Sequence, residues 1–278
     1  MDQLVTTQWL ADELGAPDLR IIDATYFLAG SDRDAQAEHE QAHIPGAVFL
    51  DLKAVSDSGS TLPNMMPPPH QFASRMQSLG IGDGARIVVY DNSPLHSAFR
   101  TWWMLRAFGA LQVAVLDGGM QKWLAEGRPV EGGRAEVRHG HFTPLPDERA
   151  VADKAFMLAN LASGSHQVLD ARSAERFAGG GPDKHGVNGG HIPGSRNLPQ
   201  DRLFNPDNSF KQGDALRAEF EAAGIDLDRP LVTTCGSGVT AAILLFGARL
   251  LGNSDVKLYD GSWTEWGADP TTPKATTT

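Results

Sequence analysis

The stretch LVTTCGSGVTAAILLFGARLLG, residues 231–252, joins three kinds of local sequence in the order strand, loop and helix. Residues 230–234 are largely apolar and β-rich, as in a strand that is buried on both faces of a parallel sheet. The helical pattern over 241–251 ends at Gly252, and glycine just past a helix is a stop signal. A cysteine and a run of small residues lie between the two. This order predicts a strand–loop–helix unit of an α/β sheet.

The same order of landmarks occurs twice along the chain. The first half has IIDAT (21–25), HIPGA (43–47), IVVYD (87–91) and VLDGGMQKWLAEG (115–127). The second half has VLDAR (168–172), HIPGS (191–195), LVTTC (231–235) and LYDGSWTEWGA (258–268). The spacings agree closely; for example, Asp91 precedes Asp117 by 26 positions and Cys235 precedes Asp260 by 25. An internal repeat of this size predicts two similar domains.

Each half alternates strand patterns with helical patterns, which predicts an α/β fold. Strands are expected at 86–90 and 230–234, and helices that end at a glycine are expected at 72–79, 98–108, 216–223 and 241–251. We therefore predict two tandem domains, each a mostly parallel sheet with helices on both faces. The first covers residues 1–135 and the second covers residues 154–278, with a linker over 136–153. The polar end TTPKATTT predicts a disordered tail from about residue 271.

Composition excludes several classes of protein. The net charge of −10 over 278 residues argues against a general nucleic-acid or membrane-surface binder. There is no run of 18 or more apolar residues for a membrane span, and the first residues lack the pattern of a secretory signal. One cysteine forms neither an internal disulfide nor a thiolate metal cage. We expect no metal, no cofactor and a reducing, cytoplasmic location.

Cys235 stands at the carboxyl end of a predicted strand, where open α/β sheets bind their ligands. The glycines at 236 and 238 allow a tight turn in which backbone N–H groups point inward. These donors and the helix dipole favour a thiolate, an anionic persulfide or an anionic sulfur donor. A buried, inert cysteine is the alternative. The loop favours a nucleophile.

On these residues, the chain resembles the tandem-domain rhodanese-type sulfurtransferases from about Trp9 to Trp266. Both HIPG segments match the family's signature, and LYDGSWTEW matches its C-terminal signature. The loop CGSGVT resembles that of the 3-mercaptopyruvate branch, whereas the thiosulfate branch typically has basic residues where Gly236 and Ser237 stand. The resemblance implies a catalytically silent first domain, with Asp91 in the place that matches Cys235.

The resemblance also implies a reaction. The Cys235 thiolate attacks the sulfur of a small anionic donor, 3-mercaptopyruvate, and pyruvate leaves an enzyme persulfide behind. A thiol such as thioredoxin or a small thiol, or cyanide, then accepts the outer sulfur. Ser237 is implied to relay a proton or to polarise the donor's thiol. The chain is expected to act as a monomer, without nucleic acid or membrane partners.

Two cations are implied to bind the donor's carboxylate. Arg176 matches a family arginine, whose planar fork suits a carboxylate. Lys184 stands at the second position and keeps the charge without the fork, while the adjacent His185 is expected to be an exposed loop residue. The rest of the loop is expected to line the donor site: Gly236, Gly238, Val239 and Thr240. Thr240 is also expected to cap the following helix.

Two positions depart from the mercaptopyruvate branch. Lys53 stands where that branch commonly has an aspartate, and Asn64 stands where it commonly has a histidine, two residues that assist the serine in that branch. A thiosulfate sulfurtransferase and a regulatory module without turnover therefore remain alternatives. A cysteine phosphatase needs an arginine six positions after the cysteine, where this chain has Ala241.

Several other residues are predicted to be structural. His43 and His191 occur in both HIPG segments and are expected to hold those turns. Asp23 and Asp170 end strands, and Asp170 is a candidate to orient Arg176. The tryptophans Trp102, Trp103 and Trp123 are expected in the core, and Trp263 and Trp266 are expected beside the cysteine loop.

Overall fold

The computed structural model describes residues 1–135, 137–180 and 187–277, which form two compact units. The N-terminal unit comprises Met1–Ser58, Met66–Asp147 and Pro206–Phe210. The C-terminal unit comprises Gly59–Met65, Glu148–Asn205 and Lys211–Thr278. Each unit therefore includes one short segment from the other half of the sequence. The predicted domain boundaries stay predictions; the division between Asp147 and Glu148 falls inside the expected linker.

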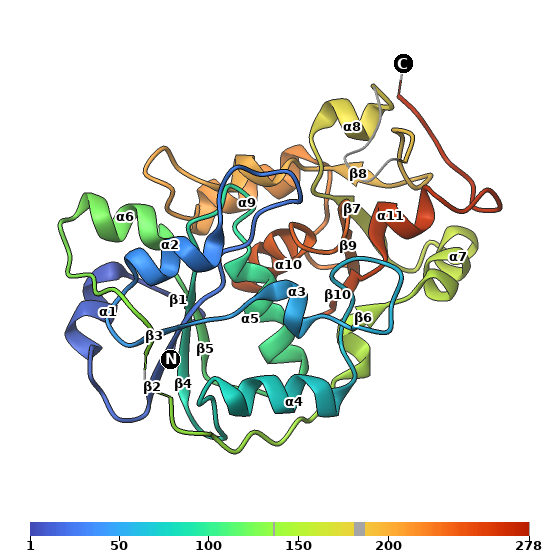
Figure 1. The fold of residues 1–278 in the computed structure, drawn as a ribbon. Coiled ribbons are helices and arrows are strands. Elements are labelled where there is room, and N and C mark those ends of the chain that lie inside the picture. The colour runs from blue at the N-terminus through green and yellow to red at the C-terminus, as the bar shows by residue number, and fades with distance from the viewer. Residues whose placement is uncertain (136, 181–186, 278) are drawn as a thin grey trace. The chain divides into compact units, whose positions relative to one another are not determined.

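The N-terminal unit is a five-stranded parallel sheet in the order β1-β5-β4-β2-β3 (Figure 1). Its strands are β1 (Leu4–Val5), β2 (Leu19–Asp23), β3 (Ala47–Phe49), β4 (Arg86–Tyr90) and β5 (Val113–Leu116). Its helices are α1 (Thr7–Glu13), α2 (Ala35–Gln41), α3 (Leu52–Val55), α4 (Pro69–Ser78), α5 (Ala98–Ala107) and α6 (Gly119–Ala125). Helix α5 packs on β4 and β5, the strands at the centre of this sheet.

The C-terminal unit repeats this topology with the order β6-β10-β9-β7-β8, again parallel throughout. Its strands are β6 (Val151–Ala152), β7 (Gln167–Asp170), β8 (Arg196–Asn197), β9 (Leu231–Thr234) and β10 (Val256–Tyr259). Its helices are α7 (Lys154–Ser163), α8 (Ala174–Ala178), α9 (Gly213–Ala222), α10 (Ala241–Leu250) and α11 (Ser262–Trp266), with 3₁₀ turns η1 (Glu148–Ala150) and η2 (Gln200–Leu203). The identical order confirms the predicted fold.

The predicted elements are found with small shifts at their ends. Strand β4 matches its expected range, and α5 and α10 each end one residue early. Helix α4 begins at Pro69, three residues before the apolar pattern, because proline has a suitable φ and needs no N–H partner in a first turn. Apolar periodicity locates a helix by its buried face, so it misses a polar first turn.

Burial concentrates on the helix that follows the cysteine loop. In α10, every side chain from Ala241 to Ala248 is buried, and the helix packs on β9 and β10. Each fully buried leucine, isoleucine or phenylalanine contributes about 1.5–3 kcal/mol to folding. The tryptophans also lie in the core as predicted: Trp102, Trp103, Trp123, Trp263 and Trp266 are each at most 2% exposed.

The expected linker over 136–153 stays a prediction; within it, Leu145 and Asp147 donate backbone N–H groups to the Phe108 and Ala107 carbonyls, and Val151–Ala152 form β6. The expectation of a disordered tail is wrong. The expected disordered tail is ordered through residue 277, and Thr272 is 5% exposed.

The tail is held by specific contacts that a polar composition does not reveal. The Trp266 indole N–H donates to the Pro273 carbonyl at 2.8 Å, and the Thr272 hydroxyl donates to the Trp266 carbonyl at 2.5 Å. His191 and Ala275 form a two-way backbone bridge at 2.8 and 2.9 Å. The tail therefore covers α11 and the second HIPG turn.

Candidate active site

Cys235 follows β9 directly, in the middle of the C-terminal sheet. Strand β9 pairs with β10 on one side and with β7 on the other, with Thr234 opposite Asp170. The Ala171 N–H donates to the Thr234 carbonyl at 2.9 Å and extends this pairing to the end of the strands. Cys235 is buried, with 2% of its surface exposed, and is a free thiol. The cysteine thus lies at the carboxyl edge of a parallel sheet, as predicted.

The segment after β10 holds the cysteine loop through its backbone. The Cys235 N–H donates to the Ser262 hydroxyl at 3.2 Å, and the Trp263 N–H donates to the Cys235 carbonyl at 3.0 Å. Thr264 donates both its N–H, at 2.9 Å, and its hydroxyl, at 2.6 Å, to the Gly236 carbonyl. The predicted contact between the DGSW segment and the loop is therefore present.

Ser262 is a site residue that sequence reasoning missed. It is fully buried and has a φ of 49°, which L-amino acids with side chains rarely adopt. Its hydroxyl accepts from the Cys235 N–H and donates to the Tyr259 carbonyl at 2.8 Å. A serine between a glycine and a tryptophan gives no periodic signal, so only the structure reveals this role.

The loop after Cys235 offers hydrogen-bond donors to a ligand. Gly236, Ser237 and Val239 are buried, and among the described residues their backbone N–H groups donate to no protein acceptor. Gly238 has a φ of 78° and provides the turn that only glycine adopts without strain. Buried N–H groups are costly to leave unsatisfied, so this loop is suited to an anion.

Thr240 does not cap α10 as predicted. It occupies the N-cap position of that helix, but its side chain makes no capping hydrogen bond. Its φ and ψ of −76° and −16° are helical, whereas a capping side chain requires an extended backbone at that position. Instead, the Ala242 and Ile243 N–H groups at the start of α10 donate to the backbone carbonyls of Val239 and Thr240, at 3.3 and 3.1 Å.

Ser237 has a partner from the first half of the sequence. The Asn64 amide nitrogen donates to the Ser237 hydroxyl at 3.2 Å, and the side chains of both residues are buried. Asn64 belongs to the segment Gly59–Met65, which is part of the C-terminal unit. The residue that replaces the histidine common in the mercaptopyruvate branch therefore contacts the serine.

Arg176 lies on α8, which begins soon after β7 at the same edge of the sheet as Cys235. It is half-buried, and its role in binding a carboxylate stays a prediction. Lys184 and His185 lie outside the described residues. Asp170 contacts Arg172, which donates to its carboxylate at 2.7–3.1 Å. The orientation of Arg176 by Asp170 stays a prediction.

Arg172 is the second site residue that sequence reasoning missed. Its side chain is completely buried, and it donates to both Asp170 oxygens and to the Gly190 carbonyl. Its guanidinium lies 4.5 Å from the centre of the Trp263 ring, a cation–π contact. This arginine joins the end of β7 to the segment that holds the cysteine loop.

The two HIPG histidines make the same structural contact, in agreement with the predicted role. Nδ1 of His43 lies 2.7 Å from the His39 carbonyl, and Nδ1 of His191 lies 2.8 Å from the Phe177 carbonyl. Each ring also stacks on the side chain of that same partner, at 4.1 Å and 3.9 Å. Each HIPG turn is thereby fixed to the end of the preceding helix.

In the N-terminal unit, Asp91 follows β4 as Cys235 follows β9. Its carboxylate accepts from the Ser93 N–H at 2.9 Å and from the Ala98 N–H, at the start of α5, at 2.8 Å. Burial raises the pKa of Asp91 to about 7, although these two donors act in the opposite direction. The Asp91 side chain thus accepts a hydrogen bond at the N-terminus of α5.

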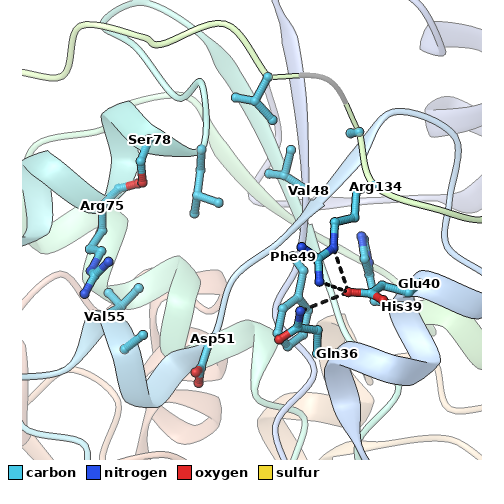
Figure 2. A pocket seen from close by; sticks show the side chains of 14 residues that line it. Gln36, His39, Glu40, Val48, Phe49, Asp51, Val55, Arg75, Ser78 and Arg134 are labelled. Carbon is cyan, nitrogen blue, oxygen red and sulfur yellow. Dashed lines mark hydrogen bonds and ion pairs between the residues drawn. The ribbon is translucent and has the colours of Figure 1, made fainter.

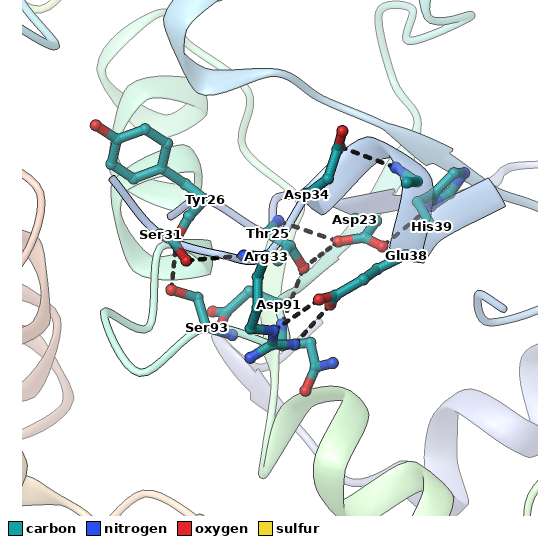
Figure 3. Close-up of polar contacts among 12 residues, drawn as sticks. Asp23, Thr25, Tyr26, Ser31, Arg33, Asp34, Glu38, His39, Asp91 and Ser93 are labelled. Atoms are coloured by element: carbon teal, nitrogen blue, oxygen red, sulfur yellow. Dashed lines mark hydrogen bonds and ion pairs between the residues drawn. The ribbon is translucent and has the colours of Figure 1, made fainter. Parts of the chain in front are cut away.

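The neighbouring strand end of the N-terminal unit carries a polar cluster. Figure 3 shows Asp23 between Thr25 and His39, with the Thr25 hydroxyl at 2.6 Å and His39 Nδ1 at 3.0 Å. The Tyr90 hydroxyl donates to the same carboxylate at 3.2 Å. Burial, together with the Asp23 charge, raises the pKa of Tyr90 well above its usual value. Asp23 is therefore a structural acceptor.

Two cavities of the N-terminal unit contain no residue of the cysteine loop. One, of about 330 Å³, is lined by β3 and by residues of α2 and α4, and Figure 2 shows Glu40 and Arg134 paired on one side of it. The other, of about 470 Å³, includes Lys53, whose ammonium group lies 5.9 Å from the centre of the Tyr26 ring.

Neither a metal site nor a membrane span is found in the described part of the chain. No group of three or more histidine, cysteine, aspartate or glutamate residues there is placed to hold an ion. None of its helices combines the length and apolar character needed to cross a bilayer.

Two copies of one five-stranded parallel sheet, with a cysteine loop at the centre of the second, define a tandem rhodanese-type protein. The rhodanese-like domain matches residues 6–126 and 154–269. The chain belongs to the rhodanese-like domain family.

Curated relatives extend this likeness over nearly the whole chain. The 3-mercaptopyruvate sulfurtransferase of Mus musculus is 41% identical over 270 residues, covering 95% of this chain and 91% of the mouse protein. The thiosulfate sulfurtransferase of Bos taurus is 39% identical over 271 residues, with coverage of 95% and 91%. Among solved structures, SseA from Escherichia coli has a TM-score of 0.87 at 38% identity, covering 95% of this chain and 99% of its own.

Proposed function

We propose that the chain is a sulfurtransferase that moves sulfur from 3-mercaptopyruvate, through a persulfide on Cys235, to a thiol or to cyanide. The observation that carries this proposal is the cysteine loop itself. A buried thiol follows the central strand β9, and three successive N-terminal residues of α11 hold the loop through its backbone. Within the described part of the chain, the backbone N–H groups of Gly236, Ser237 and Val239 donate to no protein acceptor and are suited to an anion.

The proposed first step transfers one sulfur atom. The Cys235 thiolate attacks the donor's sulfur, the carbon–sulfur bond breaks, and its electron pair remains on the three-carbon product as the enolate of pyruvate. The proton of the donor's thiol moves to that enolate and gives pyruvate. The persulfide that remains on Cys235 is an anion, and the buried N–H groups of the loop stabilise it.

The second step regenerates the enzyme. An acceptor thiolate or cyanide attacks the outer sulfur, the sulfur–sulfur bond breaks, and its electron pair returns to Cys235. We propose thioredoxin or a small thiol as the acceptor, a monomer as the working form and the cytoplasm as the location. Size-exclusion chromatography with light scattering tests the monomer, and cell fractionation tests the location.

The remaining loop and its surroundings select the donor in this proposal. Gly236, Gly238, Val239 and Thr240 bound the space beside the thiol, and Ser237 polarises or protonates the donor. Arg176 and Lys184 bind the carboxylate of 3-mercaptopyruvate, which lies at the far end of the donor from its sulfur. Thiosulfate is a compact dianion and gains more from cations within the loop, where this chain has Gly236 and Ser237.

A thiosulfate donor is the second candidate, because proteins named for each donor are about equally similar to this chain, at 41% and 39% identity. Turnover with both donors in one cyanide assay distinguishes them. We expect a higher kcat/KM for 3-mercaptopyruvate, and a strong preference for thiosulfate would refute the proposed donor.

Intact mass after exposure to each donor tests the persulfide. The wild-type chain should gain about 32 Da, the mass of one sulfur, and the Cys235→Ser variant should gain nothing. Ser163→Ala is a matched control, because Ser163 is exposed and lies at the end of α7. No mass gain with either donor would favour a regulatory module without turnover. A cysteine phosphatase is disfavoured, since Ala241 stands where its arginine is required.

A further inference from the structure

The contact between Asn64 and Ser237 joins residues 173 positions apart. Asn64 has a φ of 60°, in the left-handed region that asparagine tolerates better than most residues. Asn64 and Ser237 are each 6% exposed, so water does not readily replace either partner. The backbone and burial at this position thus present an amide group to the serine.

The direction of this hydrogen bond determines whether the proton of the Ser237 hydroxyl is engaged by Asn64. A hydroxyl group has one proton to donate and two lone pairs that accept. In the structure, the Asn64 nitrogen donates to Ser237 Oγ, so one lone pair is occupied by the amide. The serine proton is therefore not shared with Asn64 and is available for another acceptor.

We propose that Asn64 is a positioning residue that orients the Ser237 hydroxyl as a proton donor and relay toward the sulfur donor. This inference rests on the proposed function and adds to it a preference for donors whose sulfur carries a proton. Because an amide does not titrate, the orientation of the hydroxyl stays the same across the physiological pH range.

The reactions of the two candidate donors differ in whether a proton must move from sulfur to carbon. In 3-mercaptopyruvate, the sulfur begins as a thiol, and its proton must leave sulfur and reach the enolate carbon before pyruvate is formed. In thiosulfate, the Cys235 thiolate takes the outer sulfur, the sulfur–sulfur bond breaks and its electron pair leaves with sulfite. That reaction moves no proton. Loss of the Asn64 contact should therefore slow sulfur transfer from 3-mercaptopyruvate more than sulfur transfer from thiosulfate.

Three substitutions of Asn64 itself test the contact, each with a residue that tolerates the positive φ at this position. Asn64→Gly removes the amide but tolerates the positive φ, and we expect kcat/KM for 3-mercaptopyruvate to fall about tenfold, with thiosulfate changed less than about twofold. Asn64→Asp replaces the donor with an acceptor that captures the serine proton, so the same loss or a larger one is expected. Asn208→Gly is the matched control, since Asn208 also has a positive φ, of 67°, and lies outside the loop.

The third substitution is Asn64→His, which places a titrating group against the serine. An ordinary imidazole has a pKa of about 6.5. In the Asn64→His chain, the ratio of kcat/KM with 3-mercaptopyruvate to kcat/KM with thiosulfate should therefore change between about pH 5.5 and 7.5. The ratio in the wild-type chain should be flat over that range. A residue that only supports the fold would not produce this difference in pH profile.

The outcomes separate this inference from the proposed function. An Asn64→Gly chain with an unchanged donor ratio, or with equal losses for both donors, overturns the positioning role. An Asn64→Asp chain as active as wild type overturns the stated polarity of the hydrogen bond. Wild-type chain that gains no sulfur from either donor refutes the proposed function itself. Mass gain from thiosulfate in each variant verifies that Cys235 remains competent.

Discussion

Replacing Ser262 with alanine removes the hydroxyl that joins the cysteine loop to the end of β10. The Cys235 N–H and the Tyr259 carbonyl both lose a partner, and both lie in a fully buried region. A buried donor left without an acceptor costs about 1–3 kcal/mol, so we expect Ser262→Ala to lower the free energy of unfolding by about 2 kcal/mol.

A second substitution separates the hydrogen bonds from the backbone. Ser262 has a φ of 49°, which alanine retains at a cost but glycine adopts freely. Ser262→Gly loses the same hydrogen bonds and should recover about 1 kcal/mol relative to Ser262→Ala. The difference between the two variants therefore measures the conformational cost at this residue alone.

Urea unfolding followed by tryptophan fluorescence measures both values, and hydrogen–deuterium exchange of a peptide covering 231–240 reports on the loop itself. Exchange should increase in both variants, because the Cys235 N–H no longer has its acceptor. Ser262→Ala with wild-type stability and wild-type exchange would refute the anchoring role. A glycine variant less stable than the alanine variant would refute the account of backbone strain.

Three further predictions concern buried charge and the tail. The pKa of Asp91 is raised to about 7 by burial, so its proton is held in the folded chain and lost near pH 4 in the unfolded one. Stability from this group is therefore greatest at low pH and falls by about 1.4 kcal/mol per unit between about pH 4 and 7; Asp91→Asn should abolish that slope in urea unfolding. Arg172→Met should cost about 3–5 kcal/mol by leaving Asp170 charged and buried, and Asp170→Asn in the same chain should restore part of it. A chain that stops at Pro270 should lose about 2 kcal/mol, because the Trp266 contact with the tail is gone, and an unchanged melting temperature would contradict that packing.

Much of the fold follows from the sequence because strands of a parallel sheet are continuous apolar runs between turn residues. The range 86–90 matched β4 for that reason, and the repeated landmarks led to two sheets of identical order. Helix α4 is the exception, because its first turn is polar. Its first turn holds Pro69, His70 and Gln71, which carry no apolar period.

The candidate site was less accessible to sequence reasoning, because its supporting contacts join distant parts of the chain. The position of Cys235 was predictable from the loop, but the acceptor Ser262 and the buried Arg172 depend on where three strand ends meet. Thr240 has a residue type that caps helices, yet its helical backbone prevents it from doing so. The resemblance implied a histidine at position 64 as a partner of the serine, so a contact of Asn64 with Ser237 was not expected.

The assignment of Gly59–Met65 to the C-terminal unit has a consequence for how such proteins diversify. Recombination between related genes at the middle of the chain would pair one parent's cysteine loop with the other parent's residue 64. On the proposal above, such a chimera would keep its nucleophile and its carboxylate-binding residues, and would inherit from the other half only the contribution of residue 64 to donor preference. Selection for donor choice then acts on both halves of the gene together.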